Sequence, residues 1–178
     1  VYTVHDILPL DSGNSYTRSY RWVYHAADAL ICHTKTARDR LVKDFEVDKS
    51  SVHVIPHGPL LDGVSDISIQ EARDRLGLPK SDLIALQFGV IRPYKGVDVL
   101  LQAWKRVENA VSSTNLIIAG SCEQSYAEEL SNLAYRLNLQ SVRLDFRFLP
   151  EEELRTLIAA ADVLVYPYRN IPQLGALF

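Results

Sequence analysis

Two cationic side chains and two glycines lie close together in the segment FGVIRPYKG, residues 88–96. Arg92 offers a planar fork of donors and Lys95 a compact charge, a combination that suits a diphosphate. Gly89 would let a ligand approach the backbone, and Gly96 precedes a helical pattern whose first N–H groups attract anions. A diphosphate site is therefore one interpretation of these residues. The alternative is an ordinary surface turn, because the spacing matches neither a Walker A loop nor GxGxxG.

A second candidate anion site follows another apolar run, in VYPYRNIPQLGALF, residues 165–178. An aromatic- and proline-rich turn leads to Gln173 and Gly175, and the apolar residues after them predict the start of a helix. An amide side chain and a glycine before a helix suit an anion, although a simple turn is the alternative. If the two segments follow neighbouring strands of one sheet, each supports the other.

The histidines offer one further candidate. His5 follows the apolar run VYTV, where it can contact a substrate, although a lone histidine is more often structural. His53 and His57 flank VIP in extended chain, so they are not paired as on one helix face. With no HExxH or CxxC motif we predict no metal site. The sequence also lacks a GxSxG motif and a candidate thiol nucleophile.

The elements that must position these residues form an alternating series. Apolar runs alternate with helical patterns through almost the whole chain, which is typical of a parallel α/β sheet. Ligands bind beyond the carboxyl ends of such strands, where the candidate residues lie. The predicted strands are 1–4, 29–34, 52–56, 83–89, 115–120, 142–149 and 162–167. Apolar and polar residues alternate in the segment VRLDFRFL, so that strand is expected near a sheet edge.

Helical spacing of apolar residues predicts amphipathic helices over residues 97–107, 130–137 and 154–161. A further helix is predicted to start at Ser68, which forms a capping box with Glu71, and to end at Gly77. Thr36 and Asp39 predict a similar start for the helix TARDRLVKDF.

A change of composition divides the chain at HGPLLDGVSDIS, residues 57–68, which carries two glycines, one proline and no periodicity. We predict a domain boundary there. Residues 1–58 are expected to be the C-terminal part of one α/β domain, 59–78 a linker with a first helix, and 79–178 an incomplete second α/β domain. Because methionine is absent even at position 1, we expect a fragment of a longer protein.

The composition excludes several classes. With 47% hydrophobic and 23% charged residues the chain can bury a core. A formal net charge of −3 argues against a nucleic-acid binder. Neither a signal peptide nor an apolar run near the roughly 18 residues of a membrane span is present. Cys32 and Cys122 are predicted to be reduced thiols rather than a disulfide, which suits a cytoplasmic protein.

Six segments, taken together, resemble a known family. In chain order they are TVHD, ADALICHTKTARDRL, VHVIPHG, FGVIRPYKGVDVLLQAW, LIIAG and EEELRTLIAAADVLVYPYRN. They are similar to the retaining glycosyltransferases built from two facing Rossmann-like domains (glycosyl transferase group 1), which include glycogen synthases and many bacterial polysaccharide enzymes. The resemblance covers nearly the whole chain, and it implies Rossmann-like parallel sheets in an acceptor-side domain and a donor-binding domain.

The resemblance also implies an activity: transfer of a hexose from a nucleotide-diphosphate sugar to an acceptor hydroxyl with retention, usually without a metal. The nucleotide sugar is a co-substrate, and no other cofactor is implied. A saccharide or lipid-linked acceptor, a role in polysaccharide or glycoconjugate synthesis, and peripheral association of the whole protein with the inner membrane face are further expectations.

Site residues follow from the family positions that this sequence matches. His5 would face the donor sugar as the catalytic histidine, and residues 55–58 would enter the linker. The donor diphosphate would be held by Gly89, Arg92, Lys95, Gln173 and Gly175. The nucleotide base would lie along Phe148, Leu149 and Pro150.

The sequence departs from the family pattern near its end. Many members carry a glutamate where this chain has Ile171, and a second glutamate position would come just after Phe178. Another branch has Thr-Gln-Ser-Gly after PYR, of which only Gln173 and Gly175 remain here, with Leu174 between them. A sugar-nucleotide epimerase of similar shape and a non-catalytic sugar-nucleotide binding module therefore stay open as alternatives.

Overall fold

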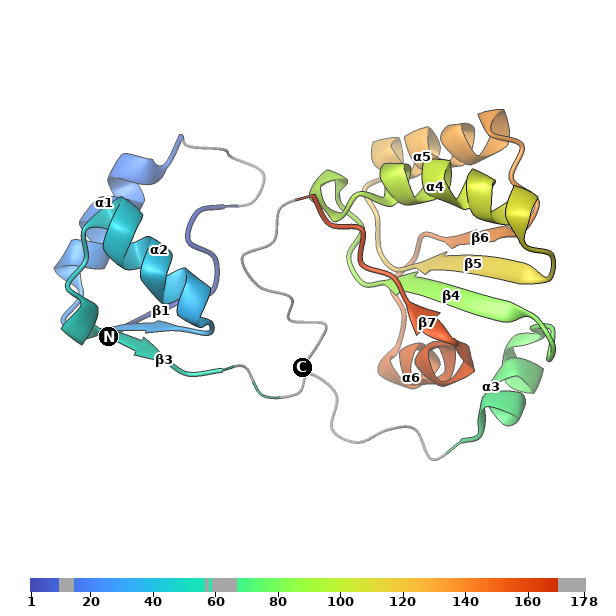
Figure 1. Cartoon of the computed structure of the whole chain (residues 1–178), viewed down its shortest axis with the longest axis horizontal. Coiled ribbons are helices and arrows are strands. Elements are labelled where there is room, and N and C mark those ends of the chain that lie inside the picture. The colour runs from blue at the N-terminus through green and yellow to red at the C-terminus, as the bar shows by residue number, and fades with distance from the viewer. Residues whose placement is uncertain (10–14, 57, 59–66, 170–178) are drawn as a thin grey trace. The chain divides into compact units, whose positions relative to one another are not determined.

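The computed structural model describes residues 1–9, 15–56, 58 and 67–169, which form two compact units, one up to residue 58 and one from residue 67. Each unit contains a parallel sheet and helices (Figure 1). This confirms the predicted α/β class. The described helices are all too short or too polar to span a bilayer. Cys32 and Cys122 are both free thiols, as predicted, and burial raises the pKa of each.

The first unit has a three-stranded sheet in the order β1-β2-β3, all parallel. Its strands are β1 (Tyr2–Val4), β2 (Leu30–Cys32) and β3 (Val52–Val54), and its helices are α1 (Thr17–Ala26), α2 (Lys35–Phe45) and the short 3₁₀ helix η1 (Lys49–Ser51). Tyr24 anchors α1 in the core, where its hydroxyl donates to the carbonyl oxygen of Ile7 (2.6 Å) and its ring meets Phe45 edge-on. The described part of this unit therefore contains the three predicted strands and, in α2, the predicted helix TARDRLVKDF.

The start of α2 differs from the prediction. The N-cap is Thr34, whose hydroxyl accepts from the N–H of Ala37 (3.0 Å), and not Thr36. Thr34 keeps the extended backbone that leaves β2, so the helix can begin directly at Lys35. The predicted cap at Ser68 is confirmed, because its hydroxyl accepts from the N–H of Glu71 (3.2 Å).

The second unit has a four-stranded parallel sheet in the order β6-β5-β4-β7. Figure 1 shows α4 and α5 on one face of the sheet and α3 and α6 on the other, and the two buried clusters divide in the same way. The strands are β4 (Leu83–Phe88), β5 (Thr114–Ala119), β6 (Val142–Asp145) and β7 (Val163–Leu164). The helices are α3 (Ile69–Leu76), α4 (Val97–Ala110), α5 (Gln124–Arg136), α6 (Glu151–Ala160) and the 3₁₀ helix η2 (Pro93–Lys95).

In the second unit, β6 and β7 are much shorter than the strands predicted over 142–149 and 162–167. β6 lies at a sheet edge, as expected, but it ends at Asp145, because its partner β5 ends at Ala119, the residue paired with Asp145. β7 pairs with β4 over two residues only, ending at Leu164 opposite Leu86. The N–H of Val165 still donates to the Leu86 carbonyl (2.8 Å), and after it the chain packs over the loop that precedes α4.

A buried arginine joins α3 to the amino ends of β4 and β7. The guanidinium of Arg73, only 4% exposed, donates to the carbonyls of Lys80 (2.7 Å) and Ala160 (3.1 Å) and pairs with Asp162 (2.6 Å). The same carboxylate oxygen of Asp162 accepts from the N–H of Ile84 (2.7 Å). Because a charge buried without its partner is costly, this network fixes α3 against the sheet.

A second polar network holds the turn before β6. One oxygen of Glu108 accepts from the backbone N–H of Gln140 (2.7 Å) and from both the N–H (2.5 Å) and the hydroxyl (2.8 Å) of Ser141. The indole N–H of Trp104 donates to the same hydroxyl (3.0 Å). Burial by itself would raise the pKa of Glu108, but the hydrogen bonds from Ser141 and Gln140, with the charge of Lys105, lower it overall.

Replacing Glu108 with glutamine should lower the free energy of unfolding at pH 7 by about 1–3 kcal/mol, because charge-assisted hydrogen bonds are lost. A carboxylate with a lowered folded pKa stabilises the protein above its ordinary pKa of 4.5 and loses that contribution as the pH falls through the folded value. The difference between wild type and variant should therefore shrink below about pH 4.5. Urea unfolding followed by tryptophan fluorescence measures it, with the exposed Glu128→Gln as control. Parallel pH profiles for wild type and Glu108→Gln would contradict the prediction.

Candidate functional site

Two loops meet at the carboxyl edge of the second sheet. β4 and β7 are parallel neighbours, with Leu86 paired to Leu164, so the segments that follow them emerge side by side. These are residues 89–96, the β4–α4 loop, and residues 165–169, the β7 segment. The condition stated for the two segments, that they follow neighbouring strands of one sheet, is therefore met by β4 and β7. Gln173 and Gly175, like Ile171 and Leu174, lie outside the described residues.

Four contacts hold the β7 segment against the β4–α4 loop. The N–H of Arg169 donates to the carbonyl of Tyr94 (2.9 Å), and its guanidinium pairs with Asp98 in the first turn of α4. The rings of Tyr94 and Tyr168 pack edge-on with centroids 6.0 Å apart. The backbone of Gly96 also approaches the carbonyl of Pro167 so closely that a Cβ on Gly96 would overlap it. The two loops therefore form one structural feature.

Lys95 lies inside this feature. It is 9% exposed, and its ammonium lies 5.3 Å from the ring centroid of Tyr168. Within the described part of the chain no carboxylate pairs with it. Burial, and next the charge of Arg92, lower its pKa. Arg92 itself is exposed. A nearly buried cation beside a second cation favours an anion as the missing partner.

The glycines around Lys95 allow close backbone packing. Gly89 has φ +99°, and a Cβ placed on it would lie 3.2 Å from the Lys95 Nζ, so the ammonium occupies the space that this glycine leaves. Gly120, directly after β5, has φ +142°, and a Cβ on it would overlap the Gly89 carbonyl. Gly120 belongs to none of the candidate sites that the sequence motifs predict. A glycine directly after the buried run LIIA was the available signal.

The three residues expected along a nucleotide base differ in their exposure to solvent. Phe148 is 78% exposed, and Pro150 is the exposed N-cap of α6. The Leu149 side chain is buried among core residues of β4, β5 and α6. Only Phe148 and Pro150 can therefore offer side-chain surface to a base, while Leu149 can contribute only its backbone.

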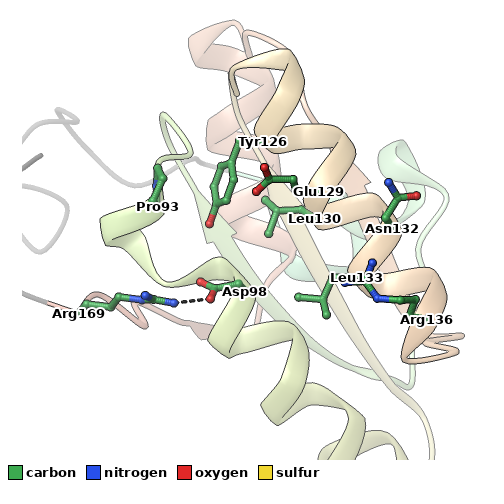
Figure 2. Close-up of a pocket in the computed structure, with 9 residues that line it drawn as sticks. All are labelled: Pro93, Asp98, Tyr126, Glu129, Leu130, Asn132, Leu133, Arg136 and Arg169. Atoms are coloured by element: carbon green, nitrogen blue, oxygen red, sulfur yellow. Dashed lines mark hydrogen bonds and ion pairs between the residues drawn. The ribbon is translucent and has the colours of Figure 1, made fainter.

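A hollow of about 460 Å³ lies between the start of α4 and the side of α5, which lines it from Tyr126 to Arg136. The Asp98–Arg169 ion pair lies beside it (Figure 2). Asp98 uses one carboxylate oxygen for Arg169, and its other oxygen is buried and has no hydrogen-bond partner among the residues that the structure describes. Burial, then the nearby Asp98 charge, raises the pKa of Tyr126 on the opposite wall. No motif in the sequence had indicated this hollow.

In the first unit, His5 is not a lone histidine. Its Nδ1 lies 3.3 Å from Nε2 of His33, and the ring centroids are 5.1 Å apart. His33 Nδ1 lies 2.9 Å from the carbonyl oxygen of Ile55. The signal was in the register: Val4 pairs with Cys32, so the residues that follow them, His5 and His33, come out at neighbouring strand ends.

Comparisons with known sequences agree along the chain. Residues 68–174 match the family model described as glycosyl transferases group 1, and residues 1–59 match the model for glycosyltransferase family 4. The D-inositol 3-phosphate glycosyltransferase of Streptomyces avermitilis is 37% identical over 156 residues, covering 82% of this chain and 33% of the relative. The D-inositol 3-phosphate glycosyltransferase of Xylanimonas cellulosilytica is 31% identical over 156 residues, covering 83% of this chain and 37% of the relative.

Two solved structures share the fold. HepE of Anabaena, solved in complex with UDP, superposes with a TM-score of 0.77 at 21% identity, covering 95% of this chain and 46% of that one. WaaG, a glycosyltransferase involved in lipopolysaccharide biosynthesis, superposes with a TM-score of 0.75 at 20% identity, covering 94% of this chain and 50% of WaaG. The chain spans about a third of the length of the curated relatives it matches.

Proposed function

The chain belongs to the glycosyl transferases group 1 family, and from that membership we propose that it takes part in moving a hexose from a nucleotide-diphosphate sugar to an acceptor hydroxyl, with retention of configuration. The observation that carries the proposal is Lys95: a nearly buried ammonium beside Arg92, at the carboxyl edge of a parallel sheet, with no carboxylate partner among the described residues. A donor diphosphate would supply the missing negative charge.

The chemistry requires charge stabilisation at the leaving group. As the bond between sugar and diphosphate breaks, negative charge grows on the phosphate oxygens, and cations fixed beside them lower the barrier. Lys95 is held by its packing against Tyr168, and Arg92 adds donors from the exposed side. Retention is accounted for if the donor phosphate assists attack of the acceptor hydroxyl on the same face, which needs no carboxylate nucleophile.

We further propose that His5 faces the donor sugar and that the acceptor is a saccharide or a lipid-linked saccharide. Two solved neighbours support a nucleotide-sugar donor and a saccharide acceptor, since HepE was crystallised with UDP-glucose and WaaG is involved in lipopolysaccharide biosynthesis. Synthesis of a polysaccharide or glycoconjugate on the cytoplasmic side of a membrane, without a required metal, completes the proposal.

A thermal-shift panel tests the proposal. The chain is incubated with UDP, GDP, ADP and dTDP, with their glucose or mannose conjugates, and with the monophosphates as controls. One diphosphate series should raise the melting temperature, because a ligand at a hundred times its Kd stabilises by about 2.7 kcal/mol. The matching monophosphate should do less, since it lacks the second phosphate. A panel without any shift would contradict a donor site. Binding without turnover, in a version of the protein with both complete domains, would favour the non-catalytic binding module.

A further inference from the structure

His5 and His33 belong to an arrangement that spans three strand ends. His5 directly follows β1, His33 directly follows β2, and Ile55 directly follows β3. The N–H of Ile55 donates to the carbonyl of Cys32 (2.8 Å), which extends the pairing of β2 and β3 by one residue. The Ile55 carbonyl is therefore fixed by the sheet. His33 contacts this carbonyl, and His5 contacts His33.

The hydrogen-bond pattern defines which nitrogens carry protons. A carbonyl oxygen can only accept, so His33 Nδ1, 2.9 Å from the Ile55 carbonyl, must be the N–H donor. A neutral imidazole has a single N–H, so His33 Nε2 is then an acceptor. The atom 3.3 Å from it is His5 Nδ1, which must in turn donate. Neutral His5 is thereby held as the Nδ1–H tautomer, with the lone pair on Nε2.

We propose that His33 is a positioning residue for the sugar-transfer site: it holds His5 in the Nδ1–H tautomer, so that His5 Nε2 accepts a hydrogen bond from a hydroxyl of the bound substrate. The assignment of the partner as a donor-sugar hydroxyl rests on the proposed function. A lone pair repels phosphate oxygens and attracts O–H groups, so the pair selects for a neutral polyol and against an anion at this position.

The tautomer can be measured without any substrate. Two-bond ¹H–¹⁵N spectra of the histidine-labelled chain, at about pH 8.5 where an ordinary imidazole is neutral, distinguish a protonated from an unprotonated ring nitrogen. His5 should show a protonated Nδ1 and an unprotonated Nε2, which is the minor tautomer of histidine in water. The His5→Gln variant assigns the signals. A protonated Nε2 on His5 in the wild-type chain would overturn the proposal.

Variants at His33 separate an acceptor from mere packing. In His33→Gln the amide oxygen can reach the position of Nε2 and accept from His5, so the tautomer should persist. In His33→Phe the ring remains without an acceptor, and His5 should revert to the Nε2–H form. His53→Gln, an exposed histidine of β3, is the matched control and should leave the His5 signals unchanged. An unchanged His5 tautomer in His33→Phe would refute the role of His33.

Kinetics then connect the tautomer to the reaction. In a version with both complete domains, His33→Phe should lower kcat/KM about tenfold, the value of one lost hydrogen bond of about 1.4 kcal/mol. The Kd of free nucleoside diphosphate should not change, because the contact is made to the sugar. His33→Gln should keep most of the activity. A failed nucleotide panel would refute the proposed function and leave the tautomer result standing. A wrong tautomer would refute this inference alone.

Discussion

Replacing Lys95 with alanine is expected to weaken binding of the preferred nucleoside diphosphate by about ten- to a hundredfold. Charge-assisted hydrogen bonds contribute about 1.5–3 kcal/mol each, and every 1.4 kcal/mol is a factor of ten in Kd. The expected effect is large because Lys95 is 9% exposed and water competes poorly for its ammonium. Titration calorimetry with UDP and GDP measures the loss. Lys105→Ala, which removes a partly buried lysine of α4 that pairs with Glu108, is the control and should bind as wild type does.

Variants of Arg92 test diphosphate binding at the same site separately. Arg92→Lys keeps the charge but loses the planar fork, so it should weaken binding as well, although less than Arg92→Ala. An ordinary surface turn predicts the opposite result, because solvated side chains contribute nothing to a ligand. Wild-type affinity in both Lys95→Ala and Arg92→Ala would therefore end the diphosphate interpretation.

The pH dependence of stability gives an independent check on Lys95. Burial and the Arg92 charge lower its folded pKa below the ordinary 10.5. At pH values between the folded pKa and 10.5, Lys95 is protonated in the unfolded chain but not in the folded protein. The contribution of Lys95 to the free energy of unfolding of the unliganded protein therefore rises with pH in this range. Lys95→Ala should remove that rise, and a bound diphosphate should reduce it by restoring the charged form. Chemical unfolding of wild type and Lys95→Ala across this pH range measures the effect, and a stability difference that falls with pH would contradict the prediction.

Several features of the fold and site were predictable because they depend on local pattern. Residues close together in the sequence determine the alternation of strands and helices. They also determine the apolar stripe of α4 and the ends of α3 at Ser68 and Gly77. The location of the candidate residues beyond the carboxyl ends of the strands followed from one rule, that ligands bind at this edge of a parallel sheet. These predictions needed no knowledge of contacts between distant segments.

The features that were missed depend on such contacts. Arg73 and Asp162 are 89 positions apart, and nothing near Arg73 distinguishes it from an exposed helix arginine. The burial of Lys95 arises from Tyr168, which arrives from another strand. His33 looked like part of an apolar strand run until the register of β1 against β2 placed it beside His5. In each case the sequence shows the residue type, and only the tertiary pairing shows its partner.

The largest structural effect is expected from Gly96→Ala, and the chain contains a matched control. Gly96 and Gly77 have nearly the same left-handed backbone, φ +68° and ψ 26° against φ +62° and ψ 35°. A Cβ on Gly77 meets nothing within 4 Å, whereas a Cβ on Gly96 overlaps the backbone carbonyl of Pro167. Gly77→Ala therefore measures the backbone strain alone, about 1–2 kcal/mol of unfolding free energy. Gly96→Ala adds the collision and should lose at least about 1 kcal/mol more.

The two variants should differ most in ligand binding. The collision in Gly96→Ala can be relieved only by moving the β7 segment away from the β4–α4 loop, which takes the Tyr168 ring off Lys95 and breaks the contacts of Arg169. Diphosphate affinity should then fall at least about tenfold, because a misplaced cation loses its hydrogen-bond geometry. Gly77→Ala lies at the end of α3, away from these loops, and should bind with wild-type affinity. Calorimetry beside urea unfolding gives both quantities for both proteins. Equal losses of stability and equal affinities would show that the close approach of Gly96 to Pro167 does not hold the site together.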